Sequence, residues 1–220
     1  MSITLEQVRQ HPAVRAYIQK SDESLMAMGY TEHSFAHVTR VARTARDILA
    51  QTGHSQREGE LAAIAGYLHD IGNIVNREGH EQSGAMMVFC LLTQMGANPD
   101  DIATIVTAIG NHDEGSASPV SEVSAALILA DKSDVRRSRV RNRETIDFDI
   151  HDRVNYAVED TRIVILDAEK EIQLQLRIDQ EVSSISEYFE IFLSRMLLCR
   201  RAASKLGHDF ALLINGQKMM

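Results

Sequence analysis

Hydrophobic residues recur every three or four positions through the first two thirds of the chain, which is the spacing of one buried helix face. Three such stretches span about residues 34–53, 58–72 and 81–96, and a glycine closes each of them. Glycine readily adopts the left-handed conformation in which many helices end. The pattern therefore predicts three amphipathic helices that are separated by short turns.

Two further helices are predicted before the pattern changes. The fourth has Asn98 as its cap and Pro99 in its first turn, where a missing N–H is tolerated. The fifth is expected to open at Ser118 and Pro119. One face of this helix carries Val120, Val123, Leu127 and Asp131. Together these patterns predict that residues 1 to about 140 are all-helical.

The pattern changes after about residue 144. Alternation and β-branched residues over residues 154–178 predict two or three strands, with turns near Glu159–Asp160 and Glu169–Lys170. A long amphipathic helix should follow and stop at Gly207, and "FALLI" is a candidate closing strand. We therefore expect a mainly α protein, with a helical domain over residues 1–144 and a small α+β domain over residues 145–220.

The composition is that of an ordinary globular protein, with 44% hydrophobic and 25% charged residues among 220. This length suits one sizeable core, or a main domain with a smaller appendage. The formal net charge of −8 argues against a general nucleic-acid or anionic-membrane binder. A local basic cluster would still suit a small phosphorylated molecule.

Three features bear on the compartment. The first residues, "MSITLEQVRQ", lack the basic and apolar segments of a secretory signal. The longest apolar run, "AMMVFCLL", is much shorter than the roughly 20 residues that cross a bilayer. Cys90 and Cys199 lie far apart in apolar helical patterns, which favours buried thiols over a disulfide. We expect a cytoplasmic protein with no membrane partner.

Polar side chains interrupt the apolar faces of four predicted helices. These side chains are His37, His69, Asp70, His112 and Asp131. A carboxylate on such a face is costly unless it is compensated. Any one of them has a simpler explanation, as a hydrogen-bonded core histidine or as half of an ion pair. A shared divalent cation would satisfy all five together, and imidazole with carboxylate suits Mn, Fe, Co, Ni or Zn better than Ca.

The segments around these residues resemble a known family. "HVTRVA" at His37, "LHDIGN" at His69 and Asp70, and "ILADKSD" at Asp131 are similar to the four-ligand signature of the HD superfamily of metal-dependent phosphohydrolases. The resemblance covers about two thirds of the chain, and the family's helical fold agrees with the predicted helices. It implies that these four residues ligate a first metal ion.

Members of this family with two metals have two more histidines, and His80 in "GHEQSGA" and His112 in "GNHDEG" occupy matching places. The alternatives are an exposed or capping His80 and a buried structural His112. Asp70 would then bridge both ions and help to hold the attacking water. The resemblance implies one or two divalent ions of Mn, Fe, Ni, Co or Zn, with Mg also acceptable.

Two residues near the ligands are candidates for a catalytic role. His33 lies one turn before His37, and either contacts substrate or orders a ligand, or else is a polar residue at the helix entry. Lys132, beside Asp131, either reaches a phosphate or forms an outward salt bridge. Asp113 is interpreted as a helix-end carboxylate and not as a ligand.

A basic cluster stands out in this acidic chain. It consists of Arg136, Arg137, Arg139, Arg141 and Arg143. Arginine binds phosphate through paired hydrogen bonds, but basic residues near a helix end also suit the helix dipole and the solvent. Either at least one of them binds substrate, or the cluster forms a solvated face or a domain contact. No role is assigned to His11, His54, His151 and His208, which fall in loops or polar stretches.

The leading hypothesis is a metal-dependent phosphohydrolase that cleaves a phosphoester or phosphoanhydride of a nucleotide or another small phosphorylated substrate. "HDIGNIVNREG" lacks the Gly-Tyr-Pro element of the family's cyclic di-GMP phosphodiesterases, which disfavours that substrate. Di-iron oxygenases of the same superfamily share the six-ligand pattern and are one alternative. The other is a non-catalytic regulatory protein that retains the metal site. A homodimer through the strand-rich part is plausible, because a small sheet leaves an edge to cover.

Overall fold

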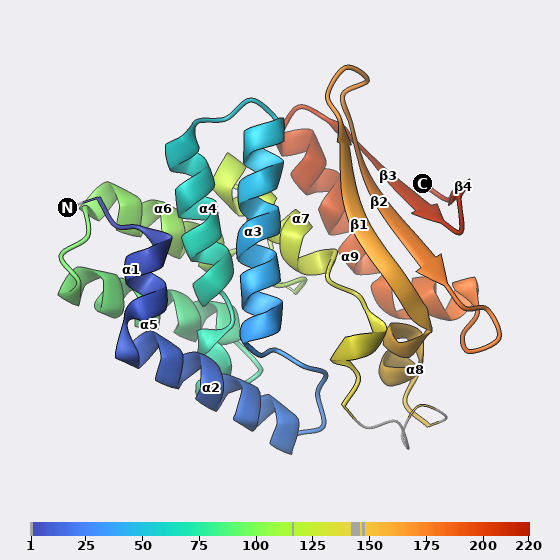
Figure 1. Ribbon diagram of the computed structural model, residues 1–220, viewed down its shortest axis with the longest axis horizontal. Coiled ribbons are helices and arrows are strands. Elements are labelled where there is room, and N and C mark those ends of the chain that lie inside the picture. The colour runs from blue at the N-terminus through green and yellow to red at the C-terminus, as the bar shows by residue number, and fades with distance from the viewer. Residues whose placement is uncertain (1, 116, 142–145, 147) are drawn as a thin grey trace.

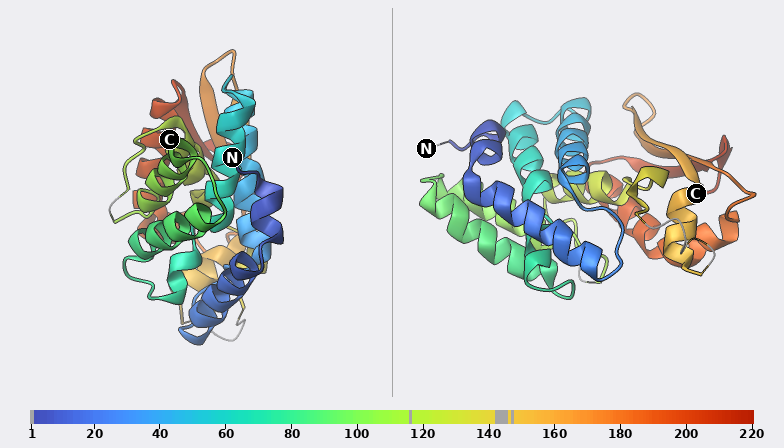
Figure 2. Two further views of the ribbon diagram at one scale, coloured as in Figure 1. Left: turned by 90° about the vertical axis from the view of Figure 1, so that its left-hand side faces the viewer. Right: turned by 60° about the horizontal axis from the view of Figure 1, so that its bottom comes forward.

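The computed structural model describes residues 2–115, 117–141, 146 and 148–220. Helices fill one end of the molecule and a small sheet lies at the other (Figure 1, Figure 2). The helices that precede the sheet are α1 (Leu5–Gln10), α2 (Pro12–Ala27), α3 (Phe35–Gln51), α4 (Gln56–Leu68), α5 (His80–Gln94), α6 (Pro99–Gly110), α7 (Glu122–Lys132) and α8 (Ile150–Ala157). Two short 3-10 helices, η1 (Ile71–Ile74) and η2 (Arg137–Arg139), lie between them. The predicted fold class, a helical bundle followed by an α+β segment, is confirmed.

The helices α3, α4 and α7 pack against one another at the centre of the helical part. Each residue of α4 from Leu61 to Leu68 is buried, so this helix has no solvent face in its second half. Small residues let it approach α3 closely: a Cβ added at Gly66 would stand 3.0 Å from the Cα of Ala42. Because α4 runs through the core, the residues at its carboxyl end are placed in the middle of the bundle.

Side-chain caps determine where several helices begin. Ser34 starts α3 by accepting a hydrogen bond from the N–H of Ala36 at 3.1 Å. The prediction for the fifth helix is wrong at its start: α7 begins at Glu122, because Ser121 accepts a hydrogen bond from the N–H of Ser124. Val120 therefore precedes the helix and is 47% exposed.

The C-terminal segment forms a four-stranded sheet with one long helix. The strands are β1 (Val158–Leu166), β2 (Glu171–Ile178), β3 (Asp209–Ile214) and β4 (Gln217–Lys218), in the order β1-β2-β3-β4. The pairs β1–β2 and β3–β4 are antiparallel, and β2–β3 is parallel because α9 (Ile185–Lys205) crosses between them. This helix contacts both the sheet and α7. It thus joins the two ends of the molecule (Figure 1).

Part of the strand prediction is wrong. Residues 154–157 belong to α8, which Asp149 caps by accepting hydrogen bonds from two N–H groups of its first turn. The chain does not turn at Glu159–Asp160, where a shift of register in β1 takes the place of the expected turn. The turn at Glu169–Lys170 and the strand at "FALLI" are confirmed. The all-helical character of the first part therefore does not extend to the whole chain.

The two cysteines have different environments. Cys199 is buried in α9, as expected. Cys90 is exposed on α5, so the expectation of two buried thiols is wrong for this residue. Its apolar neighbours Met86 and Phe89 are also exposed. An apolar run in the sequence therefore does not predict burial on the helix face that meets solvent. Among the described residues, no helix has both the length and the apolar character that crossing a membrane requires.

The close contact of η1 with α5 depends on Gly72. A Cβ at this position would lie 2.0 Å from the carbonyl oxygen of His80 and 2.5 Å from the nitrogen of Gly84. We predict that Gly72→Ala lowers the free energy of unfolding by about 3 kcal/mol, because the backbones must separate. Gly59→Ala is the matched control, since its Cβ would meet Arg46 at an ordinary 3.5 Å. Alanine there should be neutral, or stabilise α4 by up to about 1 kcal/mol. Urea unfolding followed by circular dichroism measures both, and equal stability of the two variants would contradict the prediction.

Candidate metal centre

Backbone carbonyls orient three of the predicted ligand histidines. The Nδ1 atoms of His69, His80 and His112 lie 2.9, 3.0 and 2.6 Å from the carbonyl oxygen three residues earlier in the chain. A carbonyl only accepts, so each Nδ1 carries a hydrogen, and Nε2 is the nitrogen that holds the lone pair when the ring is neutral. For His69 and His112 the carbonyl lies in the last turn of α4 or α6, where it has no partner within the helix. For His80 it belongs to Arg77, in the turn before α5. The three rings thereby offer Nε2 as a ligand atom.

His37 is oriented by a carboxylate and not by a carbonyl. Its Nδ1 lies 2.7 Å from Oδ2 of Asp134, and both side chains are almost fully buried. Arg40 and Arg136 hold Oδ1 of the same carboxylate at 3.1 and 2.8 Å. Burial by itself would raise the pKa of Asp134, but the hydrogen bond from His37 and the nearby arginines hold it below the usual value. Asp134 therefore remains charged and fixes the ring of His37.

The ligand atoms converge in two groups that Asp70 connects. Oδ2 of Asp70 lies 3.4 Å from Nε2 of His37 and 3.1 Å from Nε2 of His69, and those two nitrogens are 3.3 Å apart. Oδ1 of Asp70 lies 3.6 Å from Nε2 of His80, which is 3.2 Å from Nε2 of His112. The two oxygens of one carboxylate thus face two different pairs of imidazoles.

Asp131 completes the arrangement from α7. Its Oδ1 lies 3.4 Å from Nε2 of His37 and 3.5 Å from Nε2 of His69. Together with His69 and His112 it also forms a group whose ligand atoms all lie within 4.8 Å of one another. All six predicted metal ligands are therefore brought together, from α3, α5, α7 and the ends of α4 and α6. His80 is 2% exposed, so the exposed alternative for this residue is wrong.

Two observations indicate that this donor set fits a cation. Burial lowers the pKa of His80, and burial together with nearby positive charge lowers that of His112 to about 3, so both rings are neutral at pH 7. Their Nε2 lone pairs then face each other across 3.2 Å, an arrangement that a cation between them would stabilise. In addition, Oδ2 of Asp70 is buried and accepts no hydrogen bond from the described residues.

The other pair of histidines shows how strongly the carboxylates attract positive charge. Burial by itself would lower the pKa of His37 and His69, but the negative charge and the polar contacts of the neighbouring carboxylates raise it to about 9 and about 10. Protons therefore supply the positive charge when no cation is bound. Since ligands must be deprotonated, a divalent ion would replace these protons.

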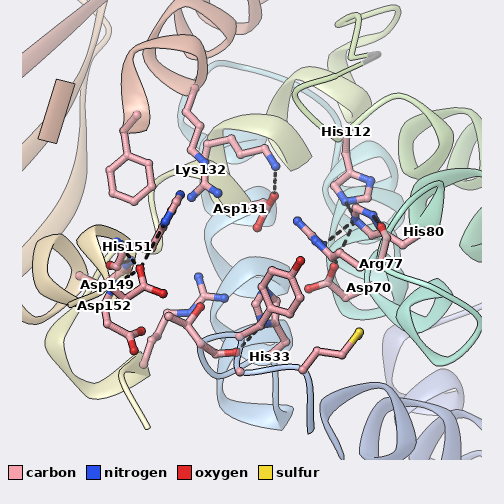
Figure 3. A pocket seen from close by; sticks show the side chains of 18 residues that line it. His33, Asp70, Arg77, His80, His112, Asp131, Lys132, Asp149, His151 and Asp152 are labelled. Carbon is pink, nitrogen blue, oxygen red and sulfur yellow. Dashed lines mark hydrogen bonds and ion pairs between the residues drawn. The ribbon is translucent and has the colours of Figure 1, made fainter. Parts of the chain in front are cut away.

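The ligand set opens into a cavity of about 480 Å³ (Figure 3). Asp70, His80, His112 and Asp131 line it, whereas His37 and His69 lie behind them and are fully buried. The cavity continues toward α8, where Asp149, His151 and Asp152 form part of its wall (Figure 3). His151, to which the sequence assigned no role, is thus among the lining residues.

The two candidates for catalysis also line this cavity. His33 directly precedes α3, with its Nδ1 2.7 Å from the carbonyl of Thr31 and its ring 5.5 Å from that of His37. Lys132 is buried, and its Nζ lies 2.8 Å from Oδ2 of Asp131 and 3.2 Å from Oε2 of Glu114. The expected salt bridge of Lys132 exists, but it is directed inward and not outward.

Most described members of the basic cluster are engaged with other parts of the protein, and only Arg141 is an exposed residue. Arg139 is 6% exposed and lines the cavity, and Arg136 binds Asp134. Arg137 and Arg141 form ion pairs with acidic residues of other segments. Arg143 lies outside the described residues. Several of these arginines therefore hold the polypeptide together around the site.

Some residues of the site were missed by sequence reasoning. They are Asp134, Arg77, Phe192 and Arg195. Asp134 is three residues after Asp131, a spacing that puts both on one side of a helix end and offered a usable signal. Arg77 precedes His80 by three residues, again close to a ligand. Nothing local distinguishes Phe192 and Arg195, which reach the cavity only because α9 packs against α7.

Comparison with known proteins identifies the family. The model of the HD domain family matches residues 34–157, which is more than half of the chain, so the protein belongs to the HD domain family. A similar solved structure is that of a predicted HD superfamily hydrolase from an uncultured Thermotogales bacterium. The two chains are 24% identical over 60% of this chain and 73% of the other, with a TM-score of 0.42. No curated protein matches the sequence.

Cation binding should stabilise the fold, because the site exists only in the folded chain. At a free manganese concentration 100 times the Kd, the gain is about 2.7 kcal/mol, or roughly 5–10 °C in the midpoint of thermal unfolding. Asp70→Asn should lose most of this shift, whereas Asp47→Asn, which changes an exposed carboxylate on α3, should keep it. A wild-type midpoint that does not move with manganese would contradict the assignment of this site.

The role of Asp134 can be separated from that of the ligands. Asp134→Asn removes the charge that fixes His37 but leaves all six ligand side chains in place. We predict that its affinity for manganese falls by about 10–100-fold, the usual effect of losing such an outer hydrogen bond. Calorimetric titration measures the affinity, with Asp47→Asn as the control of equal charge change. Wild-type affinity in a folded Asp134→Asn variant would show that the contact is not needed to orient His37.

Proposed function

We propose that this protein is a metal-dependent phosphohydrolase that cleaves a phosphoester or phosphoanhydride bond of a nucleotide or another small phosphorylated molecule. The observation that carries this proposal is the position of Asp70. Its Oδ2 lies 3.1 and 3.4 Å from Nε2 of His69 and His37, and its Oδ1 lies 3.6 Å from Nε2 of His80, which is next to His112. A carboxylate shared in this way is suited to holding two cations close together. The similar HD protein with a solved structure is itself described as a predicted hydrolase.

Divalent cations in such a site would polarise a phosphoryl oxygen and lower the pKa of a bound water. The chain's own groups supply the remaining requirements. Asp70 lines the cavity and accepts hydrogen bonds, so it would orient the attacking water. His33 donates its Nδ1 hydrogen to a carbonyl, which leaves Nε2 as a proton acceptor at the cavity wall. The ammonium group of Lys132 lies beside Asp131, where it would offset negative charge on the substrate.

The volume and walls of the cavity support a small substrate. A space of about 480 Å³ accommodates a molecule of the size that ordinary ligand pockets hold. Positive groups lie near the ligand set, and the carboxylates of Asp149 and Asp152 lie toward α8. A phosphate would bind at the end of the cavity near the ligand set. Hydroxyl or other donor groups of the same molecule would face the carboxylates at the end near α8.

Phosphatase activity should depend on manganese and on Asp70. We expect the manganese-loaded protein to hydrolyse members of a panel of phosphate monoesters, phosphodiesters and nucleotides. Asp70→Asn should lower kcat by at least about 100-fold, the size of effect expected when charge stabilisation at a reacting centre is lost. Release of phosphate or of the alcohol product is the measurement.

Asp47→Asn is the control for this experiment and should retain wild-type activity, because its exposed carboxylate lies on the outer face of α3. A panel that remains uncleaved while calorimetry shows bound manganese would refute the proposal. Oxygen consumption by the iron-loaded protein in the presence of polyols or phosphonates would then favour an oxygenase.

A further inference from the structure

Four cationic side chains line the cavity in addition to the predicted ligands: Arg77, Lys132, Arg139 and Arg195. Two of them are committed to the protein. Lys132 is buried between Asp131 and Glu114, and Arg139 is buried with its guanidinium donating to two backbone carbonyls at 2.8 Å. The side chains of Arg77 and Arg195 are 28% and 29% exposed. These two arginines, called here the arginine pair, are the most exposed of the four cations that line the cavity.

Arg77 is held in the cavity wall by weak contacts. Its Nη1 lies 3.3 Å from Nε2 of His80 and 3.3 Å from Oδ1 of Asn73, and its ion pair with Asp113 is long, at 3.8 Å. The guanidinium lies over the ring of Tyr30, 5.8 Å from its centre. None of these contacts is a close pairing with a carboxylate, so much of the positive charge of Arg77 remains available.

The contact with His80 links Arg77 to the metal site. The Nδ1 hydrogen of His80 is donated to the carbonyl of Arg77, so Nε2 is the acceptor of the guanidinium hydrogen bond. If His80 holds a cation through this Nε2, the lone pair is no longer available to Arg77, and the like charges would repel each other. The Nη1 hydrogen of Arg77 would then be available to an anion bound beside His80.

Arg195 reaches the cavity from the C-terminal part of the chain. It belongs to α9, beyond the residues that match the HD family model. Its Nε forms a close ion pair with Oε1 of Glu114, whose other oxygen accepts from Lys132. Burial by itself would raise the pKa of Glu114, but Lys132 and Arg195 lower it to about 2. The ring of Phe192, 4.5 Å from the guanidinium carbon, further fixes the Arg195 side chain.

One turn of the chain organises both arginines. Directly after the ligand His112, Asp113 pairs with Arg77 and Glu114 pairs with Arg195. Arg77 consequently lies next to His80, and Arg195 lies with Lys132 next to Asp131. Arg77 is thus connected to His80 directly, and Arg195 is connected to Asp131 through Glu114 and Lys132. An anion bound at the predicted ligands would lie between the two guanidinium groups.

We propose that the arginine pair binds the phosphoryl oxygens of the substrate, and that α9 thereby completes an active site whose six predicted metal ligands all lie within the HD domain. This inference rests on the proposed function for the identity of the anion, a phosphate ester. Arginine suits this role because its planar fork donates two parallel hydrogen bonds to phosphate. The helix that joins the sheet to α7 would then be required for substrate binding as well as for the fold.

Binding of inorganic phosphate to the manganese-loaded protein tests the proposal without any turnover. Calorimetric titration should show that Arg77→Gln and Arg195→Gln each weaken phosphate binding by about 10–100-fold, the cost of losing hydrogen bonds between charged groups. Manganese affinity should stay within about threefold of wild type, since neither residue is a proposed ligand. Arg200→Gln removes an exposed arginine from the same helix and should leave phosphate binding unchanged.

Two further measurements separate a binding role from a structural one. Arg77→Lys and Arg195→Lys keep the charge without the fork, so they should recover part of the lost affinity. Without manganese, the effect of Arg77→Gln should shrink to a few-fold, because His80 then retains the guanidinium. Thermal unfolding shows whether each variant is folded. Where a glutamine variant is not folded, the lysine variant at the same position tests the proposal instead.

The possible failures are distinguishable. Wild-type phosphate affinity in both glutamine variants, or no phosphate binding by the loaded wild type, would overturn the arginine pair even if phosphoesters are hydrolysed. Loss of phosphate binding in the variants, with no phosphoester cleaved by the wild type, would support the arginine pair and refute the proposed function alone.

Discussion

The structure is organised around negative charge in the interior of a helical bundle. Asp70 is 5% exposed in this interior, and Asp131 lies within 3.5 Å of the same two histidines. An uncompensated carboxylate in such surroundings is costly, so positive charge must accompany it. Imidazoles surround both carboxylates, and they supply that charge either as protonated rings or as ligands of a cation. The packing of the bundle therefore creates an interior site whose donor set suits a cation.

Backbone atoms, more than side chains, hold the predicted ligand histidines in position. The ends of α4 and α6 provide the carbonyls that orient His69 and His112, and α4 brings its end into the core because its second half is buried on all sides. The close approach of η1 to α5 at Gly72 then places His80 beside His112. Because rigid helix ends carry the donors, little conformational entropy remains to be lost when a cation binds.

Charges around the centre alternate from the inside outward. Asp134 lies behind His37, and Arg40 and Arg136 lie behind Asp134. On the other side, Glu114 joins Lys132 to Arg195. This alternation explains why a chain with a net charge of −8 concentrates arginines near residue 140. It also connects α9, beyond the part that matches the HD family, to the ligands themselves.

The sequence by itself determined five of the converging residues and the helices that carry them, because both follow from local spacing, whereas His80 was identified only through the resemblance to the HD superfamily. His37, His112 and Asp131 continue the apolar stripes of their own helices, and a helix buries that stripe as a unit. The short helix α8 and the exposed Cys90 were misread, since alternation and apolar content say nothing of which face meets solvent. Only the tertiary structure decided that Arg77 and Arg195 share one cavity, as they lie far apart in the chain and carry no periodic signal. Contacts between distant segments depend on how whole helices pack, and no window of sequence contains that information.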